Sequence, residues 1–463
     1  MKSRLIMLVP HDPKLDPRIH WEAAAASDRF DVSVLSYANY NLPPSIFDYF
    51  PSSSVVNLYS VRSRFSIRLR FLIWWIHFLT IREIIFAIGI SLMLATVAVA
   101  TSAALMIRTR IIKKPALEKW YLENKHWFLP RGFYNIFVFG SLIRYYCSFA
   151  LSCSEFLSSR ITLNSTDIIH ANDLLALLPG VIAKDQFKIR LIYDAHEDYP
   201  GQDPSSPWYL SGIQRWLEAK LIHCADTVVT VSPPLAQYFE RIYNVPRVYS
   251  VPNAAPYIPL TGDRNRYSIR EVAKGRVSVL FQGNFGPNRG IEQIIDAWSS
   301  IEECKAVLFI RGPNSPAKIN AIDRAARTKN LNRSVFFLES VDEDDLIEAA
   351  SVADIGLIPY LPTHPCHKFA CPNKLSQYMH AGLMILSSNL DYVKEVVEKS
   401  ECGLIYDPSD MNTFIAAVTK VSDDRKLLTK FQINAKKYGH EHFHWGAFYP
   451  TLEAAYLGNL LSQ

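Results

Sequence analysis

The feature that most constrains the fold is a regular alternation of short apolar segments with longer amphipathic ones. Apolar segments at 5–10 and 31–36 flank an amphipathic segment at 18–27. The same order resumes at residue 167 and restarts at residue 277. Such alternation predicts parallel strands joined by helices, because a parallel connection needs a crossover long enough to hold a helix. We therefore predict an α/β protein with two doubly wound, Rossmann-like sheets.

The alternation also predicts the domain boundaries. Residues 1–252 form an N-terminal domain and residues 276–442 form a C-terminal domain. Residues 253–275 have little periodicity and are predicted to be a linker, and residues 443–463 end the chain as a helix. Ligands of doubly wound sheets bind beyond the carboxyl ends of the strands. With two such domains we expect the site between them, at the loops that follow the strands.

An aromatic and basic insert at about 63–158 interrupts the first domain. It contains a charge-free run from Ile84 to Ile107, which is long enough to span a bilayer, since about 20 apolar residues suffice. Aromatic and basic residues flank this run, as they do at membrane interfaces. The alternative is a helix wholly buried in a protein core. We predict membrane-associated helices in this insert.

Topology limits how the insert meets a membrane. The strands before it and after it must join one sheet, so they must lie on the same side of the membrane. We therefore favour a membrane-embedded helical hairpin or a shallow re-entrant insert over one full crossing. Basic residues on both sides of the charge-free run would hold the protein on the cytoplasmic face of the cell membrane. They are Arg68, Arg70, Arg108, Arg110, Lys113 and Lys114.

Composition excludes other classes of function. The formal net charge of +5 is too small for a nucleic-acid footprint over the whole protein, so we predict no nucleic-acid partner. The 7 cysteines include no Cys-x-x-Cys pair, which favours a reducing compartment over a disulfide framework. The opening "KSRLIMLVP" is predicted to be a first buried strand and not a signal peptide.

Polar groups follow several predicted strands. "YDAHEDYPGQ" places His196 and Glu197 just after a strand. His196 could position a substrate hydroxyl, although a loop histidine is also often simply solvated. "LFQGNFGPNRGIEQII" places Gly283 and Gly290 around Arg289, and glycines at a helix start let backbone amides approach an anion.

"CPNKLSQYMHAGLMILSSN" supplies a second cationic helix start. Pro372 suits the first turn of a helix, Gly382 suits its end, and "LMIL" predicts a short buried strand. Lys374 could then face the same anion as Arg289, so that the two helix starts clamp a diphosphate. The alternative is a solvated helix start.

A cluster of metal-capable side chains precedes this helix. "HPCHKFAC" holds His364, Cys366, His367 and Cys371. Their spacing matches no zinc pattern, so a plain loop near the site is the favoured interpretation. We predict no metal and no cofactor.

Taken together, these segments resemble the ordered landmarks of the family-4 glycosyltransferases of the GT-B fold. The resemblance covers roughly residues 1–40 and 160–460. It rests on "DIIHANDLLALLPG", "LIYDAHEDYPGQ", "ADTVVTVSPPLAQYF", "VYSVPNAAP", "FQGNFGPNRGIEQIIDAW", "PNKLSQYMHAGLMILSS" and "CGLIYDPSD". It implies a hexosyltransferase that moves a sugar from a nucleotide-diphosphate donor to an acceptor hydroxyl, with retention and without a bound metal.

The resemblance also implies roles for single residues. His196 would be the catalytic-site residue beside the transferred sugar. The donor diphosphate would be bound by Gly283, Asn284, Arg289, Gly290 and Lys374. The ribose and nucleotide would be bound by Asn373, Gln377 and Arg311. The acceptor side would be lined by Asp12, Arg18 and Glu197. The final helix, around Trp445–Tyr456, would pack back on the N-terminal domain.

The sequence departs from the family at three positions. Asn284 stands where the family often has an arginine. Phe369 and Gln377 stand where it often has two glutamates, the second of which accepts hydrogen bonds from the ribose hydroxyls. Gln377 can still accept through its amide oxygen, without the charge assistance of a carboxylate. The departures weaken the expected ribose contact.

The partners implied are a nucleotide-sugar donor, a membrane surface and an acceptor that is lipid-linked or a saccharide. Two alternatives stay open. The first is a non-catalytic relative that binds a sugar nucleotide, which the loss of both glutamates motivates. The second is a sugar-nucleotide epimerase or phosphorylase on the same fold.

Overall fold

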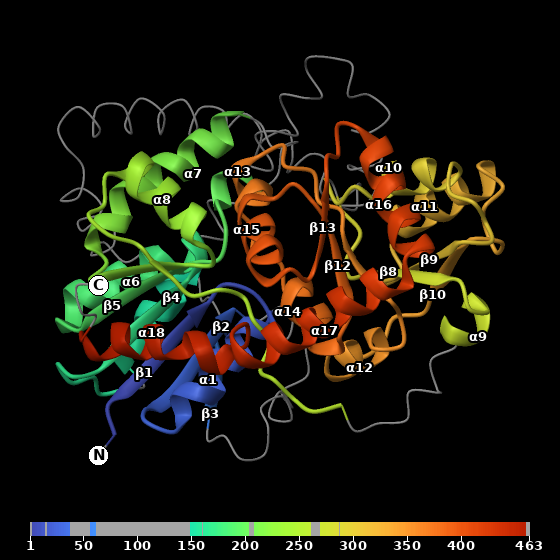
Figure 1. Ribbon diagram of the computed structural model, residues 1–463. Helices are drawn as coiled ribbons and strands as arrows, with labels where there is room; N and C mark the ends of the chain where they lie inside the picture. Colours follow the sequence, from blue (N-terminus) through green and yellow to red (C-terminus); the bar gives the residue numbers. More distant parts are fainter. Residues whose placement is uncertain are drawn as a thin grey trace, which may run out of the picture. The chain divides into compact units, whose positions relative to one another are not determined.

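The computed structural model contains two β-sheets with helices packed around them (Figure 1). It describes residues 2–13, 16–37, 56–61, 149–159, 161–202, 208–260, 269–286 and 288–459. Both sheets belong to one compact unit, formed by Met1–Ser60 and Leu163–Gln463. A second unit, Val61–Thr162, carries the helical residues 149–159.

The first sheet has 7 strands in the order β3-β2-β1-β4-β5-β6-β7. Its strands are β1 (Arg4–Val9), β2 (Asp31–Tyr37), β3 (Val56–Val61), β4 (Ile168–Asn172), β5 (Arg190–Ala195), β6 (Thr227–Thr230) and β7 (Tyr249–Ser250). Its helices are α1 (Pro17–Ser27), α6 (Asp173–Phe187), α7 (Trp208–Leu221) and α8 (Pro233–Tyr243), with 3-10 turns at Tyr199–Gly201 and Ile222–Cys224. The order reverses between β1 and β4, which makes that gap the switch point.

The second sheet has 6 strands in the order β10-β9-β8-β11-β12-β13. Its strands are β8 (Val277–Gln282), β9 (Ala306–Arg311), β10 (Val335–Leu338), β11 (Ile355–Ile358), β12 (Met384–Ser388) and β13 (Gly403–Tyr406). Its switch point lies between β8 and β11. Strands β8 to β13 pair in parallel, as the alternation predicts.

Ten helices lie in the described part of the chain after the first sheet. They are α9 (Ile269–Ala273), α10 (Ile291–Trp298), α11 (Pro316–Arg327), α12 (Leu346–Ala350), α13 (Pro365–Lys368), α14 (Lys374–Ala381), α15 (Asp391–Ser400), α16 (Met411–Asp423), α17 (Arg425–Glu441) and α18 (Trp445–Leu457). A 3-10 turn at Glu343–Asp345 precedes α12. Helix α9 lies within the segment predicted to be a linker.

Burial explains why these segments form central strands. All residues of β4, β8 and β9 are buried, so both faces of these strands are covered. Parallel sheets with helices on both faces require such continuous apolar runs. Leu5 of β1 pairs with Val32 on one side and with Ile168 on the other, and all three are buried. The pairing joins strands more than 130 residues apart in the sequence.

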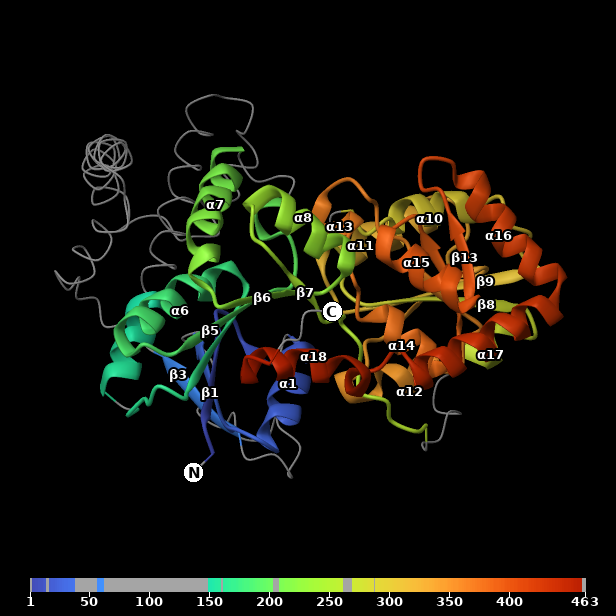
Figure 2. The same ribbon diagram turned by 60° about the vertical axis from the view of Figure 1, so that its left-hand side comes forward.

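The last helix, α18, completes the core of the first sheet. Trp445, Leu452 and Tyr456 are 4%, 0% and 1% exposed and belong to the same apolar cluster as residues of β1, β2 and α1. Both views show α18 in red beside α1 in blue (Figure 1; Figure 2). Burying an apolar side chain of this size stabilises a fold by about 1.5–3 kcal/mol, so α18 contributes substantially to the first sheet.

Most of the predicted membrane insert lies outside the described residues, although its last residues, 149–158, are helical. The run Ile84–Ile107 lies outside the described residues. Among the described residues, none of the helices has both the length and the hydropathy needed to cross a bilayer.

Candidate active site

His196 lies where three neighbouring strands of the first sheet end. Its imidazole Nδ1 is 3.1 Å from Asp16 Oδ2 and 3.7 Å from Asp173 Oδ2. Its Nε2 is 3.7 Å from Asp194 Oδ2. Asp16 follows β1, Asp173 begins α6 directly after β4, and Asp194 belongs to β5. The switch point therefore gathers one imidazole and three carboxylates.

These carboxylates decide the charge of His196. Burial by itself lowers the pKa of an imidazole, because a buried charge loses its hydration. Here Asp173, Asp16 and Asp194 outweigh burial and raise the pKa of His196 well above its ordinary value of 6.5. His196 is therefore a cation at neutral pH. Its side chain is 11% exposed, and its Nε2 is buried without a hydrogen-bond partner in the described structure.

The loop around His196 is anchored on both sides. The backbone N–H of His196 donates to Asp173 Oδ1 at 3.1 Å. Two residues on, the Asp198 carboxylate accepts from Arg215 at 2.5 Å and 3.0 Å. The Asp198 backbone oxygen accepts from Gly201 N at 2.9 Å. Asp198 therefore holds the loop in place, and its side chain is fully buried.

Arg18 takes part in this arrangement from inside the protein. It is 1% exposed, and its guanidinium donates to Asp194 Oδ2 at 2.7 Å and 3.0 Å. It also donates to Val251 O at 2.7 Å and to Asn253 Oδ1 at 2.9 Å. Contact of Arg18 with an acceptor stays a prediction, since its guanidinium is buried and bonded to protein atoms. Arg18 ties Asp194 to the segment that leaves the first sheet.

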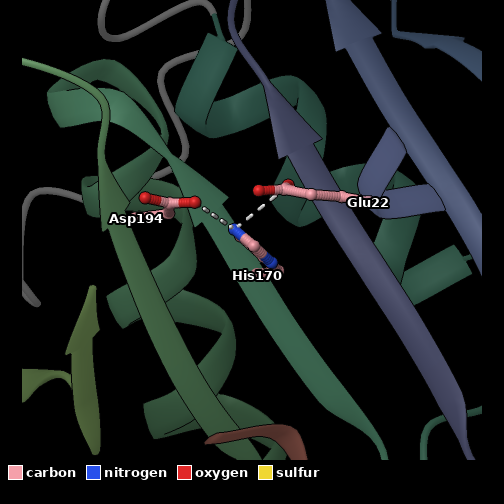
Figure 3. Close-up of side chains that lie close together, drawn as sticks. All are labelled: Glu22, His170 and Asp194. Atoms are coloured by element: carbon pink, nitrogen blue, oxygen red, sulfur yellow. Dashed lines mark ion pairs between the residues drawn. The ribbon is translucent and has the colours of Figure 1, made fainter. Parts of the chain in front are cut away.

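Three buried side chains beside Arg18 have the spacing of a metal site. The ligand atoms of Glu22, His170 and Asp194 lie within 4.8 Å of one another. Figure 3 shows His170 between the two carboxylates, with Nε2 3.7 Å from Glu22 and 3.6 Å from Asp194. A metal would have to share these carboxylates with Arg18, which lies 2.8 Å from Glu22 and 2.7 Å from Asp194. The group fits a buried ion-pair cluster better than a metal site.

The other two residues predicted for the acceptor side lie in loops at the same edge of the sheet. Glu197 follows His196 and accepts from Gln202 Nε2 at 2.5 Å. Burial and the neighbouring Asp173 raise the pKa of Glu197 to about 7, although Arg289 opposes the rise. Asp12 is half-buried in the loop after β1. Contact of either residue with an acceptor stays a prediction.

In the second sheet, Lys374 and Arg289 meet at the ring of Tyr360. Lys374 Nζ donates to the Tyr360 hydroxyl at 3.0 Å, and the Arg289 guanidinium carbon is 4.2 Å from the ring centroid. Burial alone would raise the pKa of Tyr360, but Lys374 and Arg289 hold it below its ordinary value of 10.0. Arg289 follows β8 and Tyr360 follows β11, so the pair forms at the switch point of this sheet.

Neither of these cations has a carboxylate partner. Among the described residues, no Asp or Glu oxygen lies within ion-pair distance of Lys374 or Arg289. Lys374 is only 9% exposed, and a lysine is seldom so buried unless it is paired. The two charges therefore suit an anionic ligand.

Glycines bring the backbone close to this pair. Gly283 has φ +138°, and a Cβ there would lie 2.5 Å from Lys374 Nζ. Gly290 has φ +72°, and a Cβ there would lie 1.9 Å from Pro359 O. Only glycine fits both requirements. The loop after β8 therefore lies directly against Lys374, as phosphate-binding loops lie against their cation.

The two helix starts lack side-chain caps. Gly290 precedes α10 and Asn373 precedes α14, and neither helix has a side-chain hydrogen bond at its N-cap. Asn373 Oδ1 is buried and has no hydrogen-bond partner within the described residues. Gln377, in the first turn of α14, is 7% exposed. Its side-chain amide makes no hydrogen bond to another residue in the described part of the chain. These polar groups remain available to a ligand.

Two other predicted donor-side residues differ in their burial. Asn284 is exposed in the loop after β8. Arg311 ends β9, is 3% exposed, and donates to Gln282 Oε1 at 2.8 Å. The structure thus places Arg311 in the interior below the glycine loop, and its contact with a nucleotide stays a prediction.

Cys366 and His367 contact each other, with Cys366 Sγ 3.4 Å from His367 Nδ1, whereas Cys366 and Cys371 bond to different backbone oxygens. Cys366 Sγ donates to Gly201 O at 3.0 Å, and Cys371 Sγ donates to Asn253 O at 3.7 Å. Burial raises the pKa of each thiol to about 12. Burial and Arg289 lower the pKa of His367 to about 4. The thiols hold the loop by hydrogen bonds to backbone oxygens.

The same loop bears one of the departures from the resembling family. The Ser232 hydroxyl donates to Phe369 O at 2.6 Å, and the Phe369 ring is 5.4 Å from the ring of Tyr238. Ser232 and Tyr238 belong to the start and the body of α8. Phe369 therefore contributes packing against the first sheet's helices where the family often has a carboxylate.

Four residues of the candidate site were not predicted from the sequence, namely Asp16, Asp173, Asp194 and Tyr360. Asp173, Asp194 and Tyr360 stand at or just beyond the ends of predicted strands, in "HAND", "YDAH" and "LIPY". Position alone could have indicated them, because the carboxyl ends of parallel strands meet at one edge. Asp16 gave the signal of a helix cap, and its carboxylate does accept from Arg18 N at 3.0 Å.

Two family models match the chain in succession. The model described as "Glycosyltransferase Family 4" matches residues 120–256, and the model described as "Glycosyl transferases group 1" matches residues 276–424. Each match ends or begins close to the boundary between the two sheets. The chain belongs to the family-4 glycosyltransferases with the GT-B fold, and it is a glycosyltransferase enzyme.

Individual proteins are similar at low identity. Glycogen synthase of Mycobacterium tuberculosis is 20% identical over 298 residues, which are 63% of this chain and 68% of that protein. Sucrose-phosphate synthase of Thermosynechococcus elongatus has a TM-score of 0.67 at 15% identity, covering 99% of both chains. Anabaena HepE, solved with UDP and glucose, has a TM-score of 0.63 at 14% identity, covering 98% of this chain and 100% of that one. The structural likeness confirms the GT-B fold.

Proposed function

We propose that the protein transfers a hexosyl group from a nucleotide-diphosphate sugar to an acceptor hydroxyl. The observation that carries the proposal is the pair Lys374 and Arg289, two cations without carboxylate partners in the described structure, gathered around Tyr360. The glycine loop brings backbone amides to the same place. A diphosphate supplies the missing negative charge, and the similar Anabaena HepE was solved with UDP and glucose.

The chemistry follows from this charge distribution. The bond between the anomeric carbon and the diphosphate oxygen breaks, and the acceptor oxygen forms a bond to the same carbon. The nucleotide diphosphate leaves with the electron pair and takes up the proton of the acceptor hydroxyl. Lys374 and Arg289 stabilise the negative charge that grows on the leaving group, which is the main electrostatic contribution.

In this proposal His196 lies beside the transferred sugar. As a cation whose Nε2 has no hydrogen-bond partner in the described structure, it has one N–H left to donate to a sugar hydroxyl. The carboxylates around it fix both its charge and its orientation. Gln377 and Asn373, at the start of α14, contact the ribose. Retention of the anomeric configuration is part of the proposal, because the family resemblance implies it.

We further propose a lipid-linked saccharide as the acceptor, with the protein on the cytoplasmic face of the cell membrane. The support is the charge-free run Ile84–Ile107 with its basic flanks. Nucleotide sugars are made in the cytoplasm, so the site should lie on that side.

A donor panel tests the activity. The purified protein is incubated with membrane extract and a set of nucleotide sugars, and the products are identified by mass spectrometry. We expect one sugar to be transferred and its nucleotide diphosphate to be released in equal amount. Binding of a nucleotide sugar without transfer to any acceptor would instead support the non-catalytic alternative. The anomeric configuration of the product, read by NMR, decides retention.

Fractionation tests the membrane proposal separately. We expect the full chain to stay with membranes in high salt and to be released by detergent. Release by high salt alone would contradict an inserted segment while leaving the sugar-transfer proposal intact.

A further inference from the structure

The C-terminal helix α18 reaches the buried cluster next to His196 through one hydroxyl. Tyr456 OH and His170 Nδ1 are 2.6 Å apart, and the two side chains are 1% and 0% exposed. Tyr456 is held in place by packing, since its ring lies edge-on to Phe30 at 5.6 Å within the core of the first sheet. The contact spans 286 residues of sequence.

The surroundings of His170 fix which nitrogen carries its proton. Burial lowers the pKa of His170, so the ring is neutral and holds a single proton. Its Nε2 faces two carboxylate oxygens, Glu22 Oε2 at 3.7 Å and Asp194 Oδ2 at 3.6 Å. Against the effect of burial, Arg18 holds the pKa of Asp194 well below its ordinary value, whereas burial raises the pKa of Glu22 well above its own. The Asp194 charge attracts a proton on Nε2 and would repel a bare Nε2. The proton therefore sits on Nε2, and Nδ1 accepts from the Tyr456 hydroxyl.

The Asp194 carboxylate lies between this pair and His196, near both rings but not hydrogen-bonded to either, so its influence is electrostatic. Asp194 Oδ2 is 3.6 Å from His170 Nε2 and 3.7 Å from His196 Nε2. We propose that Tyr456 is a positioning residue for His196, acting through His170 and Asp194. The inference rests on the proposed function, in which His196 lies beside the transferred sugar.

Removal of the Tyr456 hydroxyl has a defined consequence. Without the hydrogen bond at Nδ1, the His170 ring is no longer held with its Nε2–H facing Asp194, so Asp194 loses the positive end of that N–H dipole. The Asp194 charge then acts more strongly on His196. The His196 titration moves to higher pH, and the ring is drawn toward Asp194. The charged and titratable groups that face His196 or Asp194 are Asp16, Arg18 and Glu22 around α1, His170 of β4, Asp173 of α6, and Glu197 of the loop after β5.

The test compares Tyr456→Phe with Tyr449→Phe. Tyr449 is on the same helix, and its hydroxyl is buried without a hydrogen-bond partner in the described structure, so the same chemical change there removes no contact. His170→Leu and the double variant His170→Leu with Tyr456→Phe show whether Tyr456 acts through His170. Each full-length variant is first checked by its melting temperature.

Two readouts are used. The first is the NMR titration of the His196 ring, assigned with His196→Gln, which needs no turnover. The second is the pH profile of transfer. We expect Tyr456→Phe to move the His196 titration upward and to lower kcat about tenfold, with the donor KM changed by less than about twofold, because misorientation of a reacting group slows catalysis more than binding.

The outcomes separate the two proposals. Tyr449→Phe should resemble the wild type, and Tyr456→Phe should add nothing in the His170→Leu background. A His196 titration unchanged by Tyr456→Phe, or an equal change in Tyr449→Phe, would overturn the inference. An absence of sugar transfer with the expected NMR shift would count against the proposed function while leaving the link from Tyr456 to His196 in place.

Discussion

The two sheets end in loops of opposite electrostatic character. At the first sheet, His196 and Arg18 are surrounded by Asp16, Asp173 and Asp194, and each cation has a carboxylate within 3.1 Å. At the second sheet, Lys374 and Arg289 both contact Tyr360, and neither has a carboxylate partner among the described residues. Opposite charges in a buried cluster compensate one another. A cation buried without such a partner costs stability unless a ligand supplies the opposite charge. The comparison supports the proposal that the second sheet binds the anionic donor, while charged groups of the first sheet position His196.

The largest expected effect comes from removing a cation of the second sheet. Lys374→Met and Arg289→Ala should each lower turnover by about 100-fold, since one contact to a developing charge contributes on the order of 3 kcal/mol. Lys399→Met, at an exposed position on α15, is the matched control and should behave as the wild type. Steady-state kinetics with melting temperatures measure this. Near-normal turnover in both site variants, with an intact fold, would show that Lys374 and Arg289 do not bind the donor.

A smaller effect should follow from Gly283→Ala, which removes no charged group. The added Cβ would lie 2.5 Å from Lys374 Nζ, so the ammonium must shift. We expect turnover to fall about tenfold, because small displacements at a reacting centre are costly. Gly212→Ala is the control, as a Cβ there has no neighbour within 4 Å. Equal kinetics for the two alanine variants would show that the position of Lys374 does not matter.

For the first sheet, the expected effect is on stability and its pH dependence. His196 has a raised pKa, so its ion pairs stabilise the fold fully below about pH 6.5, the unfolded value, and this contribution is lost as pH rises through the folded pKa. The melting temperature of His196→Gln should therefore lie below that of the wild type near pH 6, and the difference should shrink at higher pH. The exposed His223→Gln is the control. A difference that stays constant with pH would argue against a cationic His196.

The smallest expected effect is that of Gln377→Glu. A carboxylate one turn into α14 would restore a charge-assisted hydrogen bond to a ribose hydroxyl. We expect the affinity for a nucleoside diphosphate to rise a few-fold, to be measured by calorimetric titration. Gln377 is 7% exposed, so an unpaired carboxylate there could cost stability instead. A lower melting temperature with no gain in affinity would refute the ribose contact.

The strands and helices were largely predictable, because parallel sheets require the apolar runs and amphipathic segments that the alternation shows. The helix end at Gly382 was predictable for the same kind of reason, since the residue adopts φ +76°, which favours glycine. The loops after predicted strands also drew attention to His196, Arg289 and Lys374 as candidate site residues. In each case a local pattern carried the information.

What the sequence did not reveal depends on contacts between distant segments. Arg18 precedes Asp194 by 176 residues, and nothing in the local sequence shows that its guanidinium is buried against that carboxylate. The meeting of Lys374 with Tyr360 depends likewise on how β11 and α14 pack. Charges are therefore easy to place on the chain, but whether a charge is paired can be decided only in three dimensions.

The position of α18 also has a consequence for how the protein is made. The core of the first sheet joins β1, at the start of the chain, with Leu452 and Tyr456, near its end. A ribosome synthesises the strands of that sheet long before it synthesises these two residues. The N-terminal half of the chain must therefore wait, with an incomplete core, until α18 has emerged from the ribosome. A nascent chain that stops before α18 would leave that apolar surface exposed to chaperones and proteases.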